Sequence, residues 1–193
     1  MTKSRLEAFS DGVIAIIITI MVLELKVPHG SGLSELAELV PVFICYVMSF
    51  VFVGIYWGNH HHLMHTAHHV NSKIIWANMG LLFFLSLIPF STGWMGENHF
   101  DELPVAVYAI NLLLCAIAFY ILQLVISSGL THSTQLTEAL KKHQMKGNIT
   151  LVINIAAIPC AFFYPIVSAV LFVVISILWI IPDKNIEKAL KDL

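Results

Sequence analysis

Residues 147–181, with the sequence GNITLVINIAAIPCAFFYPIVSAVLFVVISILWII, contain no aspartate, glutamate, lysine or arginine. An α-helix needs about 20 mainly apolar residues to cross a bilayer. This stretch is long enough for two such helices if Tyr164-Pro165 forms a tight turn between them. Proline suits that position because its fixed φ fits the first turn of a helix. The stretch therefore predicts two membrane-spanning helices joined by a short turn.

The whole chain has the composition of a membrane protein. Its 193 residues are 58% hydrophobic and 11% charged, whereas soluble domains contain about 45–50% apolar and about 25% charged residues. Ten basic and twelve acidic residues cannot cover the surface of a soluble protein of this size. The formal net charge of −2 argues against nucleic acid as a partner, because nucleic-acid binding needs a strongly basic face. The expected surroundings are membrane lipid.

The charged residues are bunched, and the charge-free intervals between them delimit the helices. We predict an all-α integral membrane protein with a single domain over residues 1–193. Its six predicted spans lie near 5–26, 41–60, 74–93, 103–126, 147–163 and 165–181. With six helices and the N-terminus inside, nine of the ten basic residues are cytoplasmic and only Lys26 is outside. Both termini are therefore predicted to be cytoplasmic.

The first predicted span is unusual for a membrane helix. Only Gly12 to Leu23 is free of charge, which is roughly 18 Å of helix against a hydrocarbon core of about 30 Å. The helix must therefore carry Glu7, Asp11 or Glu24 toward membrane depth. Ionisable groups at that depth usually face a bundle interior or a water-filled path.

One stripe of this helix contains Gly12, Ile16, Thr19 and Leu23, at intervals of four, three and four residues. One interpretation is a packing seam, in which Thr19 bonds back to a carbonyl one turn earlier. The other is a pore lining, in which bulky apolar side chains form a constriction and Thr19 offers oxygen atoms. The spacing alone leaves both interpretations open.

Further residues form a pattern that runs over residues 5–92. Arg5-x-x-x-Phe9-Ser10-Asp11 opens the first span, and Tyr56-Trp57-x-x-His60-His61-x-Leu63 follows at the end of the second. Asn78 lies in the third span, which Ser86-Leu87-x-Pro89-Phe90-x-Thr92 closes. In this order the pattern resembles the transmembrane protein 175 potassium-channel family.

The resemblance implies a potassium-permeable cation channel, with K⁺ as the permeating ion, no cofactor and no enzymatic activity. Prokaryotic members are similar six-helix chains of the inner, cell membrane that assemble as homotetramers around a central pore lined by the first helix. The narrowest point of the family's pore is a branched apolar residue five positions after the motif aspartate, here Ile16. Thr19 and Leu23 follow Ile16 on the stripe and complete the predicted pore site.

The motif residues Arg5, Phe9, Ser10 and Asp11 are expected to hold the first helix in register rather than to contact the ion. Arg5 and Asp11 are six residues apart and are not the closest helical pair. We therefore expect each to find partners on other helices, with His60, His61 and Asn78 as candidates. Buried polar groups in a core surrounded by lipid are costly unless they are satisfied.

Six histidines crowd the end of the second span: His60, His61, His62, His65, His68 and His69. The i, i+4 spacing of His61, His65 and His69 can hold zinc from one helix face. No cysteine or HExxH glutamate accompanies them, so we predict no metal site and keep these three residues as the candidates if one exists. A pH-sensing role also fits the residue type.

Two other functions fit parts of the pattern. A proton-coupled or metal-ion transporter could use Asp11 and the histidine cluster as a relay, although the two halves show no inverted repeat of charged or broken helices. An intramembrane zinc-dependent hydrolase could be built on the histidines, although these are bunched at one interface with no nearby general-base carboxylate.

Several smaller features carry structural expectations. Gly54-x-x-x-Gly58 would allow a close helix crossing. Pro89 and Pro159 are expected to kink their spans. Asn148 and Asn154, in the fifth span, are expected to hydrogen bond to neighbouring helices.

Overall fold

The computed structural model describes residues 1–67, 69–128 and 134–180, without the side chains of 134–143. Within these ranges the chain forms helices and no β-strand, so the predicted all-α class is confirmed for the part described. The elements in chain order are α1 (Lys3–Met21), the 3₁₀-helix η1 (Val22–Glu24), α2 (Leu33–Glu38), α3 (Val40–Thr66), α4 (Ser72–Ser86), α5 (Ile88–Glu97), α6 (Glu102–Ser127), α7 (Thr134–Phe163) and α8 (Pro165–Ile180).

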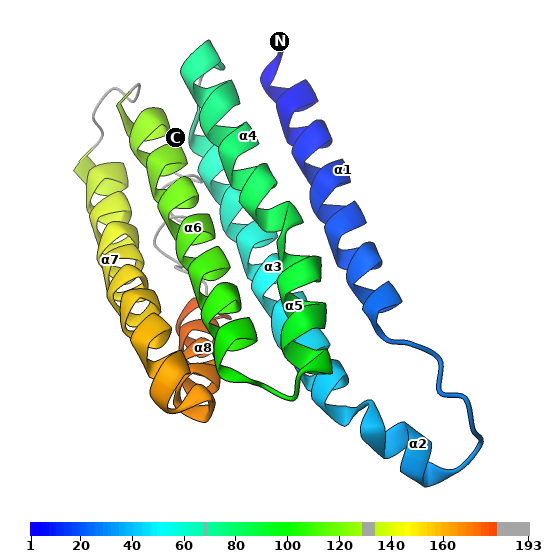
Figure 1. Cartoon of the computed structure of the whole chain (residues 1–193). Helices are drawn as coiled ribbons and strands as arrows, with labels where there is room; N and C mark the ends of the chain where they lie inside the picture. Colours follow the sequence, from blue (N-terminus) through cyan, green and yellow to red (C-terminus); the bar gives the residue numbers. More distant parts are fainter. Residues whose placement is uncertain (68, 129–133, 181–193) are drawn as a thin grey trace.

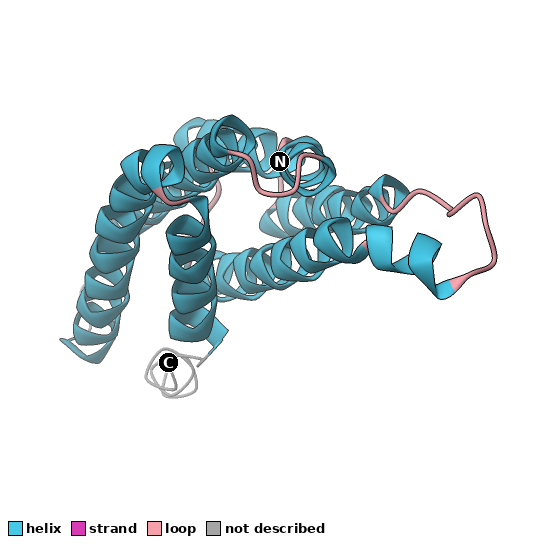
Figure 2. Ribbon diagram, turned by 60° about the horizontal axis from the view of Figure 1, so that its bottom comes forward, coloured by secondary structure: helices cyan, strands magenta, loops and turns pink. Residues whose placement is uncertain are grey.

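The long helices stand side by side and alternate in direction (Figure 1). The N-terminus and the α3–α4 connection lie at one end of the bundle, called here the N-terminal end, while α2 and the α5–α6 connection lie at the opposite end. α6 is central and packs against α3, α4, α5, α7 and α8. α1 packs against α3, α4 and α5 at one edge of the bundle. α2 and the loop before it project sideways from the bundle (Figures 1 and 2).

The described helices are those of a multi-pass membrane protein. Five segments are long and apolar enough to cross a membrane: Lys3–Glu24, Val40–Thr66, Ser72–Glu97, Glu102–Ser127 and Gln144–Phe163. α8 is apolar but shorter, with 16 residues. Large hydrophobic side chains remain exposed on many of these helices, as a surface that faces lipid requires. The count of six spans stays a prediction.

The predicted spans and the observed helices differ mainly at their ends. α3 continues to Thr66 and α7 begins at Thr134, beyond the predicted limits of residues 60 and 147. Charged or polar residues mark where a helix leaves hydrocarbon, but the backbone can stay helical in water. The first span ends earlier than predicted, because Leu25 leaves the helical region with ψ 89° before Lys26 is reached. Residue 181, where the sixth predicted span ends, lies outside the described residues.

The third predicted span consists of two helices, because the helical structure is interrupted at Leu87 between α4 and α5. Pro89 has no backbone N–H and cannot continue the helical hydrogen-bond ladder. The Leu87 amide bonds instead to the Phe84 carbonyl at 3.2 Å, in a tighter turn. Pro159, by contrast, lies inside α7, which continues to Phe163.

A chain of buried hydroxyl groups joins three helices near this break. Thr92 Oγ1 on α5 donates to Ser49 Oγ on α3 at 2.7 Å. Ser49 Oγ in turn lies 2.9 Å from the Tyr108 hydroxyl on α6. All three side chains are buried. Thr92 Oγ1 also lies 2.7 Å from the Ile88 carbonyl of its own helix, whereas the Ser49 and Tyr108 hydroxyls find their partners within this chain of hydroxyl groups.

In the described chain, the closest approach of two helix backbones that a glycine permits joins α3 and α5. A Cβ atom added at Gly96 would lie 2.7 Å from the Cα atom of Val42. A Cβ atom added at Gly54 or Gly58 would meet nothing within 4 Å. The predicted close crossing at Gly54-x-x-x-Gly58 is therefore absent from the described chain, and the small residue is needed at Gly96.

We expect Gly96→Ala to lower the melting temperature of the detergent-solubilised protein, because overpacking a helix contact costs about 1–3 kcal/mol. Gly80→Ala is the matched control, since a Cβ atom there meets nothing within 4 Å. In that control the helical preference of alanine should leave stability equal or higher by about 0.5–1 kcal/mol. Size-exclusion chromatography after heating measures the melting temperature of each variant. Equal melting temperatures of Gly96→Ala and Gly80→Ala would contradict the close contact.

Candidate functional site

α1 has two distinct faces. Its buried face consists of Leu6, Ser10, Ile14, Ile17 and Met21, spaced at three or four residues. This stripe packs the helix against α3, α4 and α5. The stripe that contains Gly12, Ile16 and Thr19 is exposed. The packing seam of α1 within the chain is therefore not the stripe that the sequence singled out.

The three residues of the predicted pore site all point away from the rest of the chain. Ile16 is 57% exposed and Leu23 is 74% exposed. Leu23 lies in η1, just beyond the end of α1. Thr19 is also exposed, and its hydroxyl donates to the Ile16 carbonyl at 2.9 Å. The Thr19 oxygen keeps its lone pairs available, because a hydroxyl group is both donor and acceptor.

A groove of about 680 Å³ runs beside this stripe, between α1 and α5. Ile16 and Ile20 line it from α1, and Phe90 and Trp94 line it from α5. Where η1 and α5 end, the wall of the groove is acidic and contains Glu24 and Glu97. The α1 face that carries Ile16 thus borders an open space rather than a packed core.

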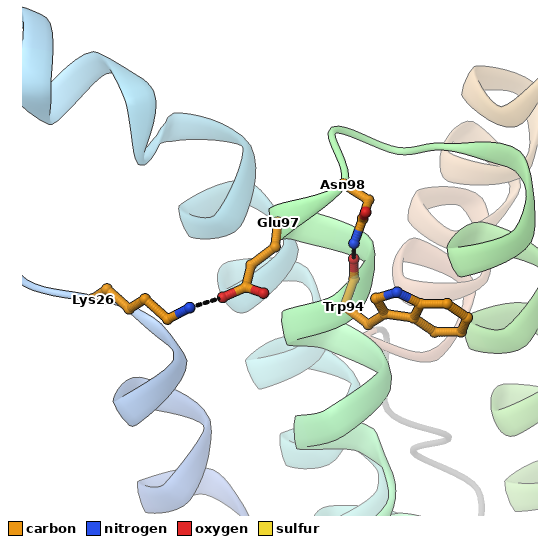
Figure 3. Close-up of polar contacts among 4 residues, drawn as sticks. All are labelled: Lys26, Trp94, Glu97 and Asn98. Atoms are coloured by element: carbon orange, nitrogen blue, oxygen red, sulfur yellow. Dashed lines mark hydrogen bonds and ion pairs between the residues drawn. The ribbon is translucent and has the colours of Figure 1, made fainter.

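The acidic part of the groove holds an ion pair at the end of the bundle opposite the N-terminus. Lys26 contacts the carboxylate of Glu97, at the end of α5 (Figure 3). The hydrogen bond and the negative charge of Glu97 raise the pKa of Lys26 and outweigh the smaller, opposite effect of desolvation. Asn98 donates to the Trp94 carbonyl at 2.8 Å and closes the last turn of α5.

Three of the predicted network residues form a buried hydrogen-bonded chain across three helices. Asn78 Nδ2 on α4 donates to Ser10 Oγ on α1 at 2.9 Å. His60 Nε2 on α3 lies 2.7 Å from Asn78 Oδ1, so His60 is the donor of that bond. Ser10 then donates to the Leu6 carbonyl of its own helix at 2.9 Å. All three side chains are buried.

The charged motif residues are placed differently from the prediction. Asp11 accepts a hydrogen bond from Trp57 Nε1 at 2.9 Å, not from His60, His61 or Asn78. Arg5 is exposed and makes no side-chain hydrogen bond or ion pair with the described part of the chain. Phe9 is also exposed. The chain therefore gathers Ser10, Asn78 and His60, while Arg5 and Phe9 face outward.

Two residues of this region were not predicted as site residues. Trp57 binds Asp11, and its place in the Tyr56-Trp57 motif was a usable signal because a tryptophan N–H usually needs an acceptor. Glu7 lies half-buried on α1, and its Oε1 atom has no hydrogen-bond partner within the described chain. No spacing in the sequence indicated that Glu7 would be covered.

Only some of the clustered histidines lie close together in the structure. The His61 and His65 rings meet edge to face, with centroids 4.5 Å apart. His68 lies outside the described residues, and His69 is exposed beyond the end of α3. In the described part of the chain, no three His, Cys, Asp or Glu side chains lie close enough together to hold a metal ion. His61, His65 and His69 thus do not form one group.

The comparisons with known proteins agree with the sequence pattern. The family model of the endosomal/lysosomal potassium channel TMEM175 matches residues 5–89. A potassium channel of Chryseobacterium sp. (strain P1-3) is 50% identical over 192 residues, which are 100% of this chain and 100% of that protein. The endosomal/lysosomal proton channel TMEM175 of Gallus gallus is 29% identical over 185 residues, which are 84% of this chain and 36% of that protein.

A solved structure has the same fold. The crystal structure of a lysosomal potassium-selective channel TMEM175 homolog from Chamaesiphon minutus matches with a TM-score of 0.79 and 26% identity. The match covers 94% of this chain and 97% of that one. The family predicted from the motifs is confirmed, and the chain belongs to the family of the endosomal/lysosomal potassium channel TMEM175.

Proposed function

We propose that this chain forms a potassium-permeable channel, a homotetramer whose central pore is lined by α1. The observation that carries this proposal is the exposed stripe of Ile16, Thr19 and Leu23 on a helix at the edge of the bundle. Four such stripes facing one axis would bury apolar side chains that a single chain leaves uncovered. The names of the bacterial relatives support potassium as the permeating ion.

The residue types of the stripe suit passive cation flux. A ring of Ile16 side chains makes an apolar constriction, which can control flow by dewetting. A ring of Thr19 hydroxyls next to it supplies oxygen atoms that partly replace the hydration shell of the ion. Flux of this kind needs no cofactor and no catalytic residue.

The proposed topology has six spans and both termini in the cytoplasm, in a cell membrane of the bacterial inner-membrane type. Lys26, the one basic residue that this topology places outside, pairs with Glu97 at the end opposite the N-terminus. Lys3 and Lys73 lie at the N-terminal end, as the excess of basic residues in cytoplasmic segments requires. Lys184, Lys188 and Lys191, which contribute to this orientation, lie outside the described residues.

Neither alternative function gains support from the site. A proton or metal-ion relay would be supported by a hydrogen bond between Asp11 and a histidine, but the Asp11 carboxylate accepts from Trp57. The proposed zinc-dependent hydrolase needs ligands gathered in one place, and no three His, Cys, Asp or Glu side chains of the described chain are gathered in this way. The name of the chicken relative specifies protons, so proton flux is measured beside potassium flux in the following experiment.

We expect Ile16→Asn and Thr19→Ala each to reduce the preference for potassium over sodium by about threefold or more, equivalent to ~0.7 kcal/mol. Ile16→Asn replaces the dry constriction with a hydrated amide, and Thr19→Ala removes the oxygen ligand. Purified protein in liposomes, with potassium, sodium and proton flux measured separately, tests both changes.

Thr66→Ala is the control for this experiment. Thr66 donates to the carbonyl three residues earlier, as Thr19 does. Unlike Thr19, it has a buried side chain, at the last residue of α3. Its replacement should leave ion preference unchanged. An unaltered potassium-over-sodium preference in both α1 variants would refute the pore assignment, and saturable flux that requires a proton gradient would favour the transporter.

The role proposed for Ser10, Asn78 and His60 is to fix the rotation of α1, and so the direction in which Ile16 points. We expect Asn78→Leu to lower the melting temperature and the potassium flux, because the buried His60 N–H loses its acceptor at a cost of about 1–3 kcal/mol.

Asn59→Leu is the matched control, since Asn59 donates only to the Ile55 carbonyl of its own helix. Heating followed by size-exclusion chromatography gives the melting temperatures of the two variants. If Asn78→Leu is no less stable than Asn59→Leu, the three residues do not hold α1 in place.

A further inference from the structure

A second cavity lies inside the bundle, between α3, α6, α7 and α8 and apart from α1. The centre of a water-sized sphere can move through about 50 Å³ of it, where one water molecule needs about 10–15 Å³. The cavity therefore has room for more than one water molecule or for one small organic ring. Aspartate, glutamate, lysine, arginine and histidine are missing from its described lining.

Most of the cavity wall is apolar. Phe52 and Ile55 contribute from α3, Leu112 and Phe119 from α6, and Ile175 from α8. Pockets that bind small molecules have this character, with mostly hydrophobic walls and a few placed polar groups that orient the ligand. The wall predicts an occupant with an apolar body and no charge.

One fully buried polar atom in the described part of the wall has no partner. Asn154 on α7 is 2% exposed and lines the cavity. Its Oδ1 atom makes no hydrogen bond within the described chain, although the sequence predicted a neighbouring helix as partner. A buried carbonyl oxygen without a donor is destabilising, so it favours any occupant that can supply one.

Several neighbouring polar groups have partners inside the protein. Thr150 accepts from Trp179 Nε1 at 2.7 Å and donates to the Lys146 carbonyl at 3.0 Å. Asn59 donates to the Ile55 carbonyl. Asn154 Oδ1 is the fully buried acceptor of the described wall that has no partner.

We propose that this cavity binds a small uncharged amphiphile whose hydroxyl donates to Asn154 Oδ1, while its apolar body lies against Phe52, Leu112 and Ile175. The site adjoins the helix segment that holds α1. Tyr56 and Asn59 of α3 line the cavity. The intervening Trp57 and the adjacent His60 hold α1 and α4 through Asp11 and Asn78.

The test uses the full-length protein in lipid nanodiscs and the probe 4-bromophenol, whose bromine quenches tryptophan fluorescence. Trp179 lies in the cavity wall and reports binding. 4-Bromoanisole has the same ring and bromine but no hydrogen-bond donor. We expect saturable quenching, absent in Trp179→Phe, with 4-bromophenol bound about tenfold more tightly than 4-bromoanisole, as one net hydrogen bond to a buried acceptor predicts.

Asn154→Leu should remove the preference for 4-bromophenol, because it removes the acceptor and keeps the apolar wall. Asn148→Leu is the matched control, since Asn148 is exposed on the same helix and should keep the tenfold preference. Ala116→Leu, which fills the cavity from α6, should weaken both probes equally.

Three results would overturn the proposal. Quenching that rises linearly with probe concentration in the wild-type protein would show partition into lipid alone. Equal affinities of the wild type for the two probes would show that no acceptor is available. A tenfold preference that survives in Asn154→Leu would place the acceptor elsewhere. If Asn154→Leu does not fold, the two probes with the wild type and Ala116→Leu still decide the outcome, and none of these measurements depends on ion flux.

Discussion

The hydrogen bonds of Asn78 are the constraint on which the arrangement of α1 depends. The Asn78 amide donates to Ser10 on α1 and accepts from His60 on α3. Inside a membrane no water replaces a lost partner, so these groups must meet one another. The Asp11–Trp57 hydrogen bond is a second polar contact between α1 and α3, and the rest of the buried face of α1 is mostly apolar. We propose that these polar contacts select one rotation of α1, and with it the outward direction of Ile16 and Thr19.

α3 contacts α1, the buried hydroxyl chain and the internal cavity through different side chains. One face carries Trp57 and His60 toward Asp11 and Asn78. Ser49 joins the buried hydroxyl chain with Thr92 and Tyr108. Tyr56 and Asn59 line the internal cavity. The continuous helix from Val40 to Thr66 therefore relates the α1 contacts to the interior of the bundle.

The sequence predicted some parts of the site well and others poorly, for physical reasons. The predicted network contained Arg5, Phe9, Ser10, Asp11, His60, His61 and Asn78, because buried polar residues need partners. Of these, Ser10, Asn78 and His60 are hydrogen bonded to one another in the structure. The partner of Asp11 was not predicted, because helical spacing describes one helix and Trp57 lies on another. Helix ends were also misplaced, since the end of a charge-free interval locates the membrane boundary rather than the end of the helix.

The composition and motifs by themselves determined the membrane environment, the all-helical class and the family, because these follow from residue types and their order along the chain. Only the tertiary structure decided which stripe of α1 is covered by the rest of the chain, that Gly96 rather than Gly54 or Gly58 is the close contact, and that Asn154 faces a cavity without a partner. Each of these depends on how helices far apart in the sequence are rotated against one another. That rotation is set by packing and by buried hydrogen bonds between helices, which no single helix encodes.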